Sequence, residues 1–196
     1  MTIADVRRAD AGDAEAISAL LASAFADYAW TRWTVDGDDH QRRVETLQRL
    51  ALTELVLPFG EAWAATDETD QIVSVAMWMR PDISVPSEVW ERVAPLTAEL
   101  EGARHVASME AQAMCDPFRP TEPHYYLGAV GTLPSQQRLG YATALLEPVL
   151  RRADLAYLET CGESNVRFYE GLGFEVTAKV IVPNGGPTVW CMATSS

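Results

Sequence analysis

Residues 134–143, PSQQRLGYAT, have the residue types of a turn that holds a phosphate group. They follow a strand-like run and open a helical run, where unpaired backbone N–H groups and the positive end of the helix dipole coincide. Gly140 would let the backbone approach an anion closely, and Arg138 would add a charge-assisted contact. A glycine before a helix is more often a simple turn, so both interpretations stand at this point. The chain contains neither the Walker A pattern GxxxxGK(S/T) nor the Rossmann pattern GxGxxG.

The elements that must position this turn are strands and helices in a mixed α/β order, predicted from hydrophobic periodicity and turn residues. Strands are expected at 2–8, 61–65, 71–79, 124–134, 155–160, 174–182 and 187–193. Helices are expected from the cap residue Asp10 to Tyr28, at 39–56, within 86–116 with breaks at Pro95 and Gly102, at 142–153 across Pro148, and at 165–171. The segment 29–38 is expected to be a loop, and PNGG at 183–186 a hairpin turn.

Composition narrows the class of protein. The 196 residues are 48% hydrophobic and carry a formal net charge of −13, which predicts one folded domain over 1–196 and no nucleic-acid binding. Solubility explains this charge, and a cationic substrate is the weaker interpretation. The three cysteines and three histidines lack zinc-ligand spacing, so we expect no metal site and a reducing cytoplasm. No signal peptide or membrane span is recognisable, so we expect no membrane association.

A family resemblance covers essentially the whole chain. QRLGYA at 137–142 matches the Q/R-x-x-G-x-G/A loop of the GCN5-related N-acetyltransferase (GNAT) superfamily, and NVRFYEGLGFEV at 165–176 matches a second stretch. The order of strands and helices is similar as well. The resemblance implies a single-domain GNAT fold, with a mixed central sheet of about seven strands that is splayed between the fourth and fifth strands and flanked by helices.

The resemblance also implies acetyl-CoA as cosubstrate, held in the split. Its pantetheine would pair with backbone groups of Val130, Gly131 and Thr132, and a backbone N–H near Thr132 would stabilise the oxyanion. Its pyrophosphate would bind the loop residues Gln137, Arg138, Leu139, Gly140, Tyr141, Ala142 and Thr143. The family usually has an aliphatic residue at Thr132 and Arg, Lys or Gly at Leu139. Neither departure removes a backbone donor.

Tyr169 is the catalytic residue that the resemblance implies, because the family's tyrosine at this place protonates the departing thiolate. A phenol of pKa ~10 can pass a proton to a sulfur of pKa ~8.5 with modest help. Taken alone, Tyr169 and Phe168 would be interpreted as core aromatics of a short helix. Asn165 shares the helix face of Tyr169 and resembles a cofactor-binding asparagine, although helix N-capping explains it equally well.

The general base stays open. His124 has a suitable intrinsic pKa, yet a lone histidine at a strand end is more often a surface residue. Glu110 and Asp27 are acidic alternatives, and a water chain would suffice for an α-amine of pKa ~7.7–8.

The acceptor is expected to be a small-molecule primary amine. Tyr28, Trp30 and Trp33 follow the first predicted helix, where aromatic walls would suit a flat ring. The stretches at 24–40, 157–160 and 188–192 are most similar to family members that acetylate the aminonucleoside antibiotic puromycin. Another amine (a polyamine, another antibiotic or a protein N-terminus) and a non-catalytic acyl-CoA sensor are the alternatives, with a monomer or homodimer as the assembly.

Overall fold

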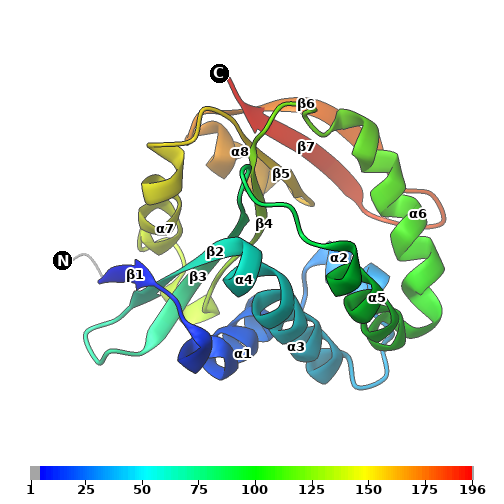
Figure 1. Ribbon diagram of the computed structural model, residues 1–196, viewed down its shortest axis with the longest axis horizontal. Coiled ribbons are helices and arrows are strands. Elements are labelled where there is room, and N and C mark those ends of the chain that lie inside the picture. The colour runs from blue at the N-terminus through cyan, green and yellow to red at the C-terminus, as the bar shows by residue number, and fades with distance from the viewer. Residues whose placement is uncertain (1–4, 196) are drawn as a thin grey trace.

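Seven strands form one mixed sheet in the computed structural model, which describes residues 5–195 (Figure 1). The strands lie in the order β1-β2-β3-β4-β5-β7-β6. All neighbours are antiparallel except β4 and β5, which are parallel. The strands are β1 (Val6–Arg8), β2 (Gly60–Thr66), β3 (Ile72–Met79), β4 (Tyr125–Thr132), β5 (Ala156–Thr160), β6 (Phe174–Ile181) and β7 (Thr188–Thr194). The predicted mixed seven-stranded sheet is thus confirmed.

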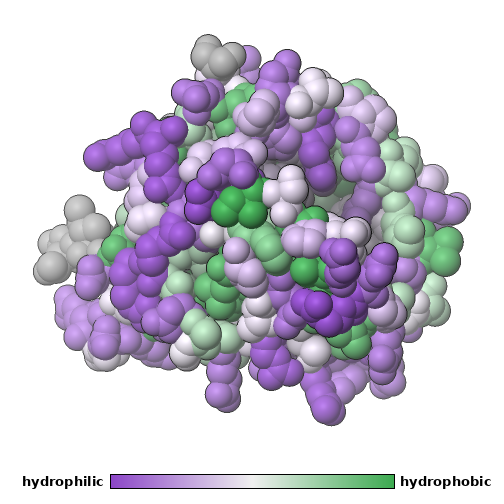
Figure 2. Space-filling view, viewed as in Figure 1, coloured by the Kyte–Doolittle hydropathy of each residue, from purple (hydrophilic) through white to green (hydrophobic). Residues whose placement is uncertain are grey.

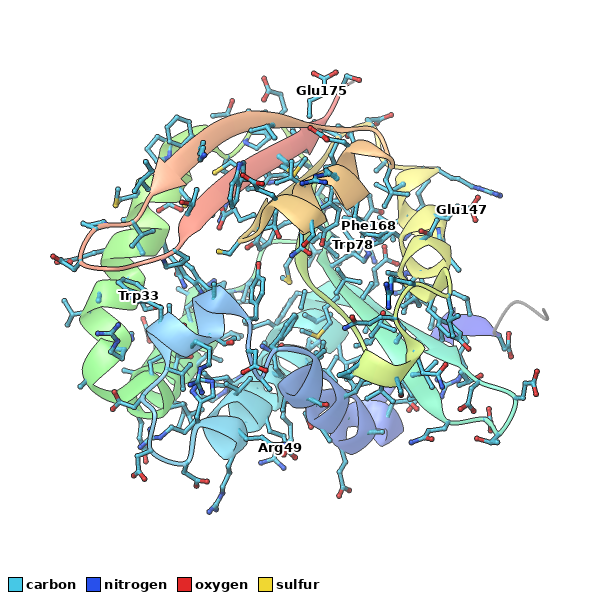
Figure 3. All side chains as sticks on the ribbon, turned by 180° about the vertical axis from the view of Figure 1, so that it is seen from behind. Trp33, Arg49, Trp78, Glu147, Phe168 and Glu175 are labelled. Carbon is cyan, nitrogen blue, oxygen red and sulfur yellow. The ribbon has the colours of Figure 1, made fainter. Side chains whose placement is uncertain are left out.

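Helices cover both faces of this sheet. Their bounds are α1 (Ala14–Ala24), α2 (Ala29–Thr34), α3 (His40–Leu50), α4 (Leu57–Phe59), α5 (Ser87–Glu101), α6 (His105–Cys115), α7 (Tyr141–Leu150) and α8 (Glu163–Glu170). Short 3-10 turns are η1 (Ala11–Asp13), η3 (Gly102–Arg104), η4 (Asp116–Phe118) and η5 (Pro134–Gln136), and η2 (Ala51–Val56) is a π-helix. On one face α7 and α8 pack over buried Trp78, and Figure 3 shows Trp78 and Phe168 pointing into this interior. On the other face α1 and η2 cover the first strands, and α6 covers the last strands.

The sheet splits between β4 and β5. Only Tyr125–Leu127 pair with Ala156–Leu158, although β4 continues to Thr132. At the point of divergence β4 contains a bulge, because Trp78 pairs with Leu127 while Met77 pairs with Ala129. Gly128 is the extra residue of this bulge, and a bulge adds local twist to its strand. The predicted splay between the fourth and fifth strands is therefore confirmed.

Three local predictions were wrong. The expected loop at 29–38 contains α2, whose Thr31 hydroxyl donates to the carbonyl of Phe25 at 2.7 Å and fixes the turn into the helix. The helix predicted to end at residue 56 continues through Pro58 to Phe59. Pro58 lies in the first turn of α4, the position at which a helical segment tolerates proline. Pro95 lies inside α5, so of the two predicted breaks only the one at Gly102 (φ 63°) is present, where the turn η3 separates α5 from α6.

The ends of other elements agree with their sequence signals. Asp10 caps η1 by accepting a hydrogen bond from the N–H of Gly12, and Asp13 completes a capping box. The first predicted strand begins outside the described residues and is seen from Val6. In the PNGG turn Asn184 and Gly185 both have positive φ, as a tight hairpin between β6 and β7 requires. Within residues 5–195 no helix is long and apolar enough to cross a membrane.

Candidate active site

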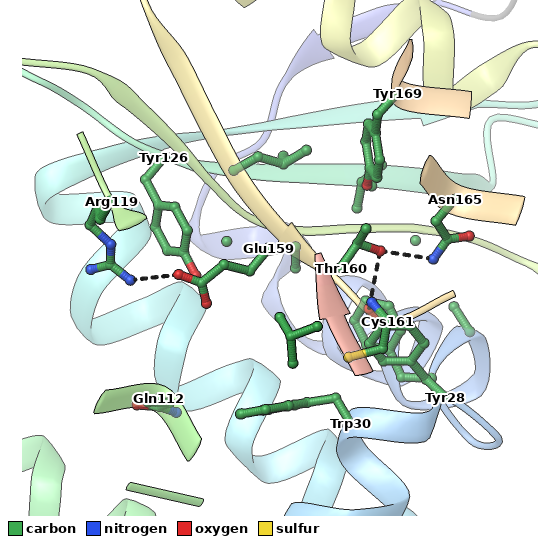
Figure 4. A pocket seen from close by; sticks show the side chains of 18 of the residues that line it. Tyr28, Trp30, Gln112, Arg119, Tyr126, Glu159, Thr160, Cys161, Asn165 and Tyr169 are labelled. Atoms are coloured by element: carbon green, nitrogen blue, oxygen red, sulfur yellow. Dashed lines mark hydrogen bonds and ion pairs between the residues drawn. The ribbon is translucent and has the colours of Figure 1, made fainter. Parts of the chain in front are cut away.

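The split between β4 and β5 opens into a cavity of about 690 Å³, called here the first cavity (Figure 4). Its walls come from the diverging strands, the end of α1, α2, α6 and α8. Figure 2 shows the surface hollowed on the inner side of α6. A volume of this order is typical of a small-molecule site.

Beyond Leu127 the edge of β4 offers this cavity backbone groups that do not pair with β5, although the Thr132 carbonyl accepts from Gln137 Nε2 at 3.4 Å. The N–H of Leu133 donates to the carbonyl of Val73 in β3, and the Gly131 carbonyl accepts from the Ser74 hydroxyl at 3.0 Å. Because backbone groups alternate along a strand, those of Val130 and Thr132 face away from β3 and into the split. Gly131 instead serves packing, since a Cβ there would lie 2.7 Å from Leu21 of α1. Of the three predicted backbone partners, the strand geometry leaves two facing the split.

The predicted phosphate-binding loop lies at the N-terminus of α7, beyond the end of β4. Arg138 (φ 63°) and Gly140 (φ 89°) adopt left-handed conformations that turn the chain into the helix. The Gly140 carbonyl accepts from the N–H of Ala144, so the N–H groups of the first helical turn, at 141–143, have no partner within the helix. Residues Gln137, Arg138, Leu139 and Gly140 are exposed, and Gln137 also lines the first cavity.

Tyr169 of α8 is buried, with 6% of its surface exposed, and lines the first cavity. Its ring packs on Phe168 and edge-on against Phe174. Figure 4 shows its hydroxyl directed into the cavity, and within residues 5–195 no protein group is hydrogen-bonded to it. Burial raises the pKa of this phenol, so it keeps its proton at neutral pH. Tyr169 thus combines core packing with a free hydroxyl at the site.

Asn165, Thr160 and Tyr28 form a hydrogen-bonded chain at the end of β5. The Asn165 amide donates to Thr160 Oγ1 at 3.0 Å, and the Tyr28 hydroxyl lies 3.3 Å from the same oxygen. The N–H of Cys161 donates to the Tyr28 hydroxyl at 2.7 Å. The capping explanation of Asn165 is wrong, because α8 begins at Glu163 with Gly162 as its cap residue. Burial raises the pKa of Tyr28 to about 12.

The structure brings two of the three predicted acceptor aromatics to the site. Tyr28 and Trp30 line the first cavity, together with Trp90 of α5. Trp33 does not: its ring lies under the Arg104 guanidinium at 5.1 Å, and its backbone carbonyl accepts from Arg104 Nε. Figure 3 shows Trp33 beside α6. Trp30 and Trp33 lie three residues apart on one side of α2, with ring centroids 6.5 Å apart, yet of these two only Trp30 lines the first cavity.

A carboxylate that was not predicted, Glu159 of β5, lies on the wall of the first cavity. Its Oε1 accepts from Arg119 Nη2 at 3.1 Å and from the Tyr157 hydroxyl at 3.0 Å, as Figure 4 shows for Arg119. The Arg119 guanidinium is held over the ring of Tyr126 at 4.8 Å. The Glu159 side chain is 16% exposed. A charged residue near the end of an apolar strand was the available sequence signal.

The predicted base candidates occupy other places. Glu110 and Asp27 are exposed and are not among the residues that line the first cavity. His124 is half-buried, with Nδ1 2.8 Å from the carbonyl of Glu122 and its ring edge-on to Tyr157. It lines a second opening rather than the first cavity. Among residues 5–195 no group of three His, Cys, Asp or Glu side chains is placed to hold a metal ion.

That second opening, called here the second chamber, has a volume of about 650 Å³. It lies beside the first cavity, and five residues line both spaces: Trp90, Gln112, Arg119, Tyr126 and Gly128. Its remaining walls come from α3 and η2, the end of β3, and the proline-rich segment 120–123 before β4.

Comparison with known proteins places this geometry in a family. The family model described as the acetyltransferase (GNAT) family matches residues 23–174. A structure from Corynebacterium glutamicum described as histone acetyltransferase HPA2 and related acetyltransferase is 26% identical, with a TM-score of 0.76, and the match covers 99% of this chain and 97% of that one.

More distant structures share the fold. The polyamine N-acetyltransferase of Drosophila melanogaster, which catalyses the formation of N-acetylagmatine, has 18% identity and a TM-score of 0.60, covering 98% of this chain and 99% of that one. The ribosomal-protein-S18-alanine N-acetyltransferase of Escherichia coli has 14% identity and a TM-score of 0.57, covering 98% and 94%. With a family model matched over most of its length and a split sheet that opens into a cavity, this chain belongs to the GNAT family of acetyltransferases, whose members use acetyl-CoA.

Proposed function

We propose that this enzyme transfers the acetyl group of acetyl-CoA to the primary amine of a small molecule by direct attack within the first cavity. The observation that carries the proposal is the placement of Tyr169 and Glu159 on the walls of one cavity at the split. Tyr169 belongs to the α8 face of the sheet, whereas Glu159 lies on the α6 face with Tyr157. Tyr169 as general acid and Glu159 as general base can therefore act from the two sides on groups that react in this cavity.

The residues at the split fit acetyl-CoA. Backbone groups of Val130 and Thr132 face the opening without a strand partner, which suits pairing with an extended amide-containing chain. The free N–H groups at the start of α7, together with Arg138, suit a pyrophosphate. When bound, acetyl-CoA supplies the thioester whose acyl group is transferred. Asn165 also lines the cavity, and we propose it as a further contact.

Tyr169 is proposed as the general acid. Its raised pKa keeps the phenol protonated, and its hydroxyl has no competing protein partner among the described residues. Positioned proton transfer of this kind contributes about 10²–10⁴-fold to a rate. The departing sulfur is the atom that would receive this proton.

Glu159 is proposed to receive the ammonium group of the acceptor and to take its proton. Arg119 and Tyr157 both bond Oε1, and within residues 5–195 no donor is bonded to Oε2. One oxygen of this cavity-lining carboxylate is therefore fixed, while Oε2 is left to accept from a bound amine. Asp116 is the other carboxylate on the cavity wall, but 63% of its side chain is exposed. A half-enclosed carboxylate next to aromatic rings suits a cationic amine.

For the acceptor itself we propose an aminonucleoside such as puromycin. The aromatic walls of Trp30, Trp90 and Tyr126 suit flat rings, and the sequence stretches noted above support this choice. Polyamines and agmatine are the competing acceptors, since the fold is shared with enzymes that act on them. The physiological role would be antibiotic inactivation in the first case and amine metabolism in the second.

The test is release of free thiol from acetyl-CoA, followed with a chromogenic disulfide, in the presence of puromycin, agmatine or spermidine. Mass spectrometry checks that the amine gains one acetyl group. We expect turnover with puromycin, and Tyr169→Phe should lower kcat by about 10²–10⁴-fold with little change in CoA affinity. Tyr125→Phe is the matched control, because Tyr125 packs on Trp78 and is not among the cavity residues. Turnover with agmatine or spermidine alone would overturn the choice of acceptor, and turnover with none would overturn the proposed reaction.

A further inference from the structure

The second chamber has an apolar floor and a polar rim. Leu55 and Val56 of η2 and Met77 and Met79 of β3 supply apolar surface, and Pro81, Pro120 and Pro123 extend it. Arg80, Glu122 and His124 add charged or titratable side chains to its lining, besides Arg119 and Tyr126, which it shares with the first cavity. A concave space of this size with mostly apolar walls suits the hydrophobic part of a ligand.

The second chamber is continuous with the proposed reaction site. The five residues shared by the two spaces include Arg119 and Tyr126, and Arg119 also holds Glu159. A ligand whose amine reaches Glu159 therefore lies beside the mouth of the second chamber.

Gly128 marks the boundary between the two spaces. It is the bulge residue of β4, it is exposed, and it lines both. A Cβ at this position would meet only ordinary contacts, 3.8 Å from the Met77 carbonyl and 3.9 Å from the Tyr126 ring. Close packing therefore does not require glycine here, in contrast with Gly131. The missing side chain leaves the boundary open.

The wall contributed by η2 is itself unusual. Residues Ala51–Val56 form a π-helix between α3 and α4. π-helical segments are rare and occur frequently at functional sites, because they redirect side chains that an α-helix would place elsewhere. Here the segment places Ala51, Leu55 and Val56 on the chamber wall.

We propose that the second chamber binds the apolar, ring-bearing part of the acceptor while its amine lies at Glu159 in the first cavity. This inference rests on the proposed function. It makes the enzyme selective for amines that carry a hydrophobic group over small or purely polar amines. One or two well-placed apolar groups in such a pocket change kcat/KM by about 10–200-fold.

The experiment compares ethylamine with 2-phenylethylamine, which differ only in the ring, using thiol release from acetyl-CoA. We expect kcat/KM for 2-phenylethylamine to exceed that for ethylamine by about tenfold or more in the unmodified enzyme. Met79→Gln places a polar group in the second chamber, and Gly128→Leu fills its boundary. Each should lower this ratio at least severalfold. Ile181→Gln is the matched control, because Ile181 lies on β6 and is 71% exposed.

The outcomes separate the two proposals. No thiol release with either amine or with puromycin contradicts the proposed function itself. Turnover with a ratio near one, or a ratio that Met79→Gln and Gly128→Leu both leave intact, overturns the second chamber as the ring site. Leu55→Gln provides a second substitution from η2 if Gly128→Leu fails to fold, and circular dichroism with CoA-dependent thermal stabilisation checks each variant.

Discussion

The backbone N–H of Cys161 donates a hydrogen bond of 2.7 Å to the phenol oxygen of Tyr28, joining the end of β5 to the turn before α2. Tyr28 also lies 3.3 Å from Thr160 Oγ1, which accepts from Asn165. Thr160 at the end of β5 and Cys161 just after it are thereby tied to the turn before α2, and Thr160 is also tied to α8. These hydrogen bonds fix the β5 side of the split beyond Leu158, where β5 no longer pairs with β4.

Tyr28→Phe removes this tie while keeping the ring. It leaves the Cys161 N–H without its partner, so we expect a loss of about 1–2 kcal/mol in the free energy of unfolding. Because we expect the end of β5 to position the acceptor, kcat/KM should fall about three- to tenfold. Urea denaturation and thiol-release kinetics measure the two effects. An unchanged kcat/KM alongside the loss in stability would show that the tie is structural only.

Glu159→Gln keeps the shape of the side chain and removes its charge. We expect kcat/KM for a good amine to fall by about 10²-fold or more, with the larger part in kcat, because the ammonium loses both its partner and its proton acceptor. Asp116→Asn, on the same cavity wall but exposed, should change kcat/KM less than about threefold. Equal effects of the two substitutions would contradict the proposed role of Glu159.

The pH dependence of kcat/KM in Glu159→Gln separates a catalytic role of Glu159 from a structural one, because loss of a purely structural role would not change that dependence. The titratable groups near Glu159 are Asp116 of η4, Arg119 just after η4, Tyr126 of β4, Tyr157 of β5, Cys115 of α6, Cys161 after β5 and Cys191 of β7. If Glu159 takes the proton, Glu159→Gln should show activity that rises with pH until the free amine itself deprotonates. An identical profile in both enzymes would count against proton transfer to Glu159.

Buried phenols and thiols predict a loss of stability at alkaline pH. Burial raises the pKa of Cys161 to about 11 and that of Tyr28 to about 12, above unfolded values of about 8.5 and 10. The folded state therefore holds protons that the unfolded chain releases, and stability falls as pH rises. The decline should begin above about pH 8.5 and steepen above about pH 10. Urea midpoints from pH 7 to 11 measure it, and Cys161→Ala should flatten the first part.

Glu61 of β2 predicts a different sensitivity. It is 3% exposed and forms ion pairs with Arg8 of β1 and Arg152 after α7. Glu61→Ala leaves two neighbouring guanidinium groups without their shared carboxylate, and we expect a loss of about 2–4 kcal/mol. Glu147→Ala removes an exposed partner of Arg151 and should cost less than about 0.5 kcal/mol. If urea denaturation gave equal losses in the free energy of unfolding for the two variants, the burial of Glu61 would not be what makes its ion pairs important.

The sequence by itself determined the family and the order of the seven strands, although it did not predict α2. Local signals were sufficient where the chain's own neighbours decide conformation: the Asn184–Gly185 turn, the Asp10 cap, and the turn around Gly140 into α7. The apolar period of each segment predicted the strands and helices, and the motif at 165–174 indicated Tyr169. These features depend on the order and spacing of residue types along the chain, which can be taken directly from the sequence.

Only the tertiary structure decided which residues share a cavity. Trp33 has the same residue type as Trp30 and lies on the same helix, yet it packs against Arg104 and does not line the first cavity. Glu159 gave little sequence signal, because its position depends on Arg119, 40 residues earlier, and on where β4 and β5 part. The second chamber likewise requires η2, β3 and the segment before β4 to meet. Such long-range contacts arise from the packing of distant segments, and no local pattern encodes them.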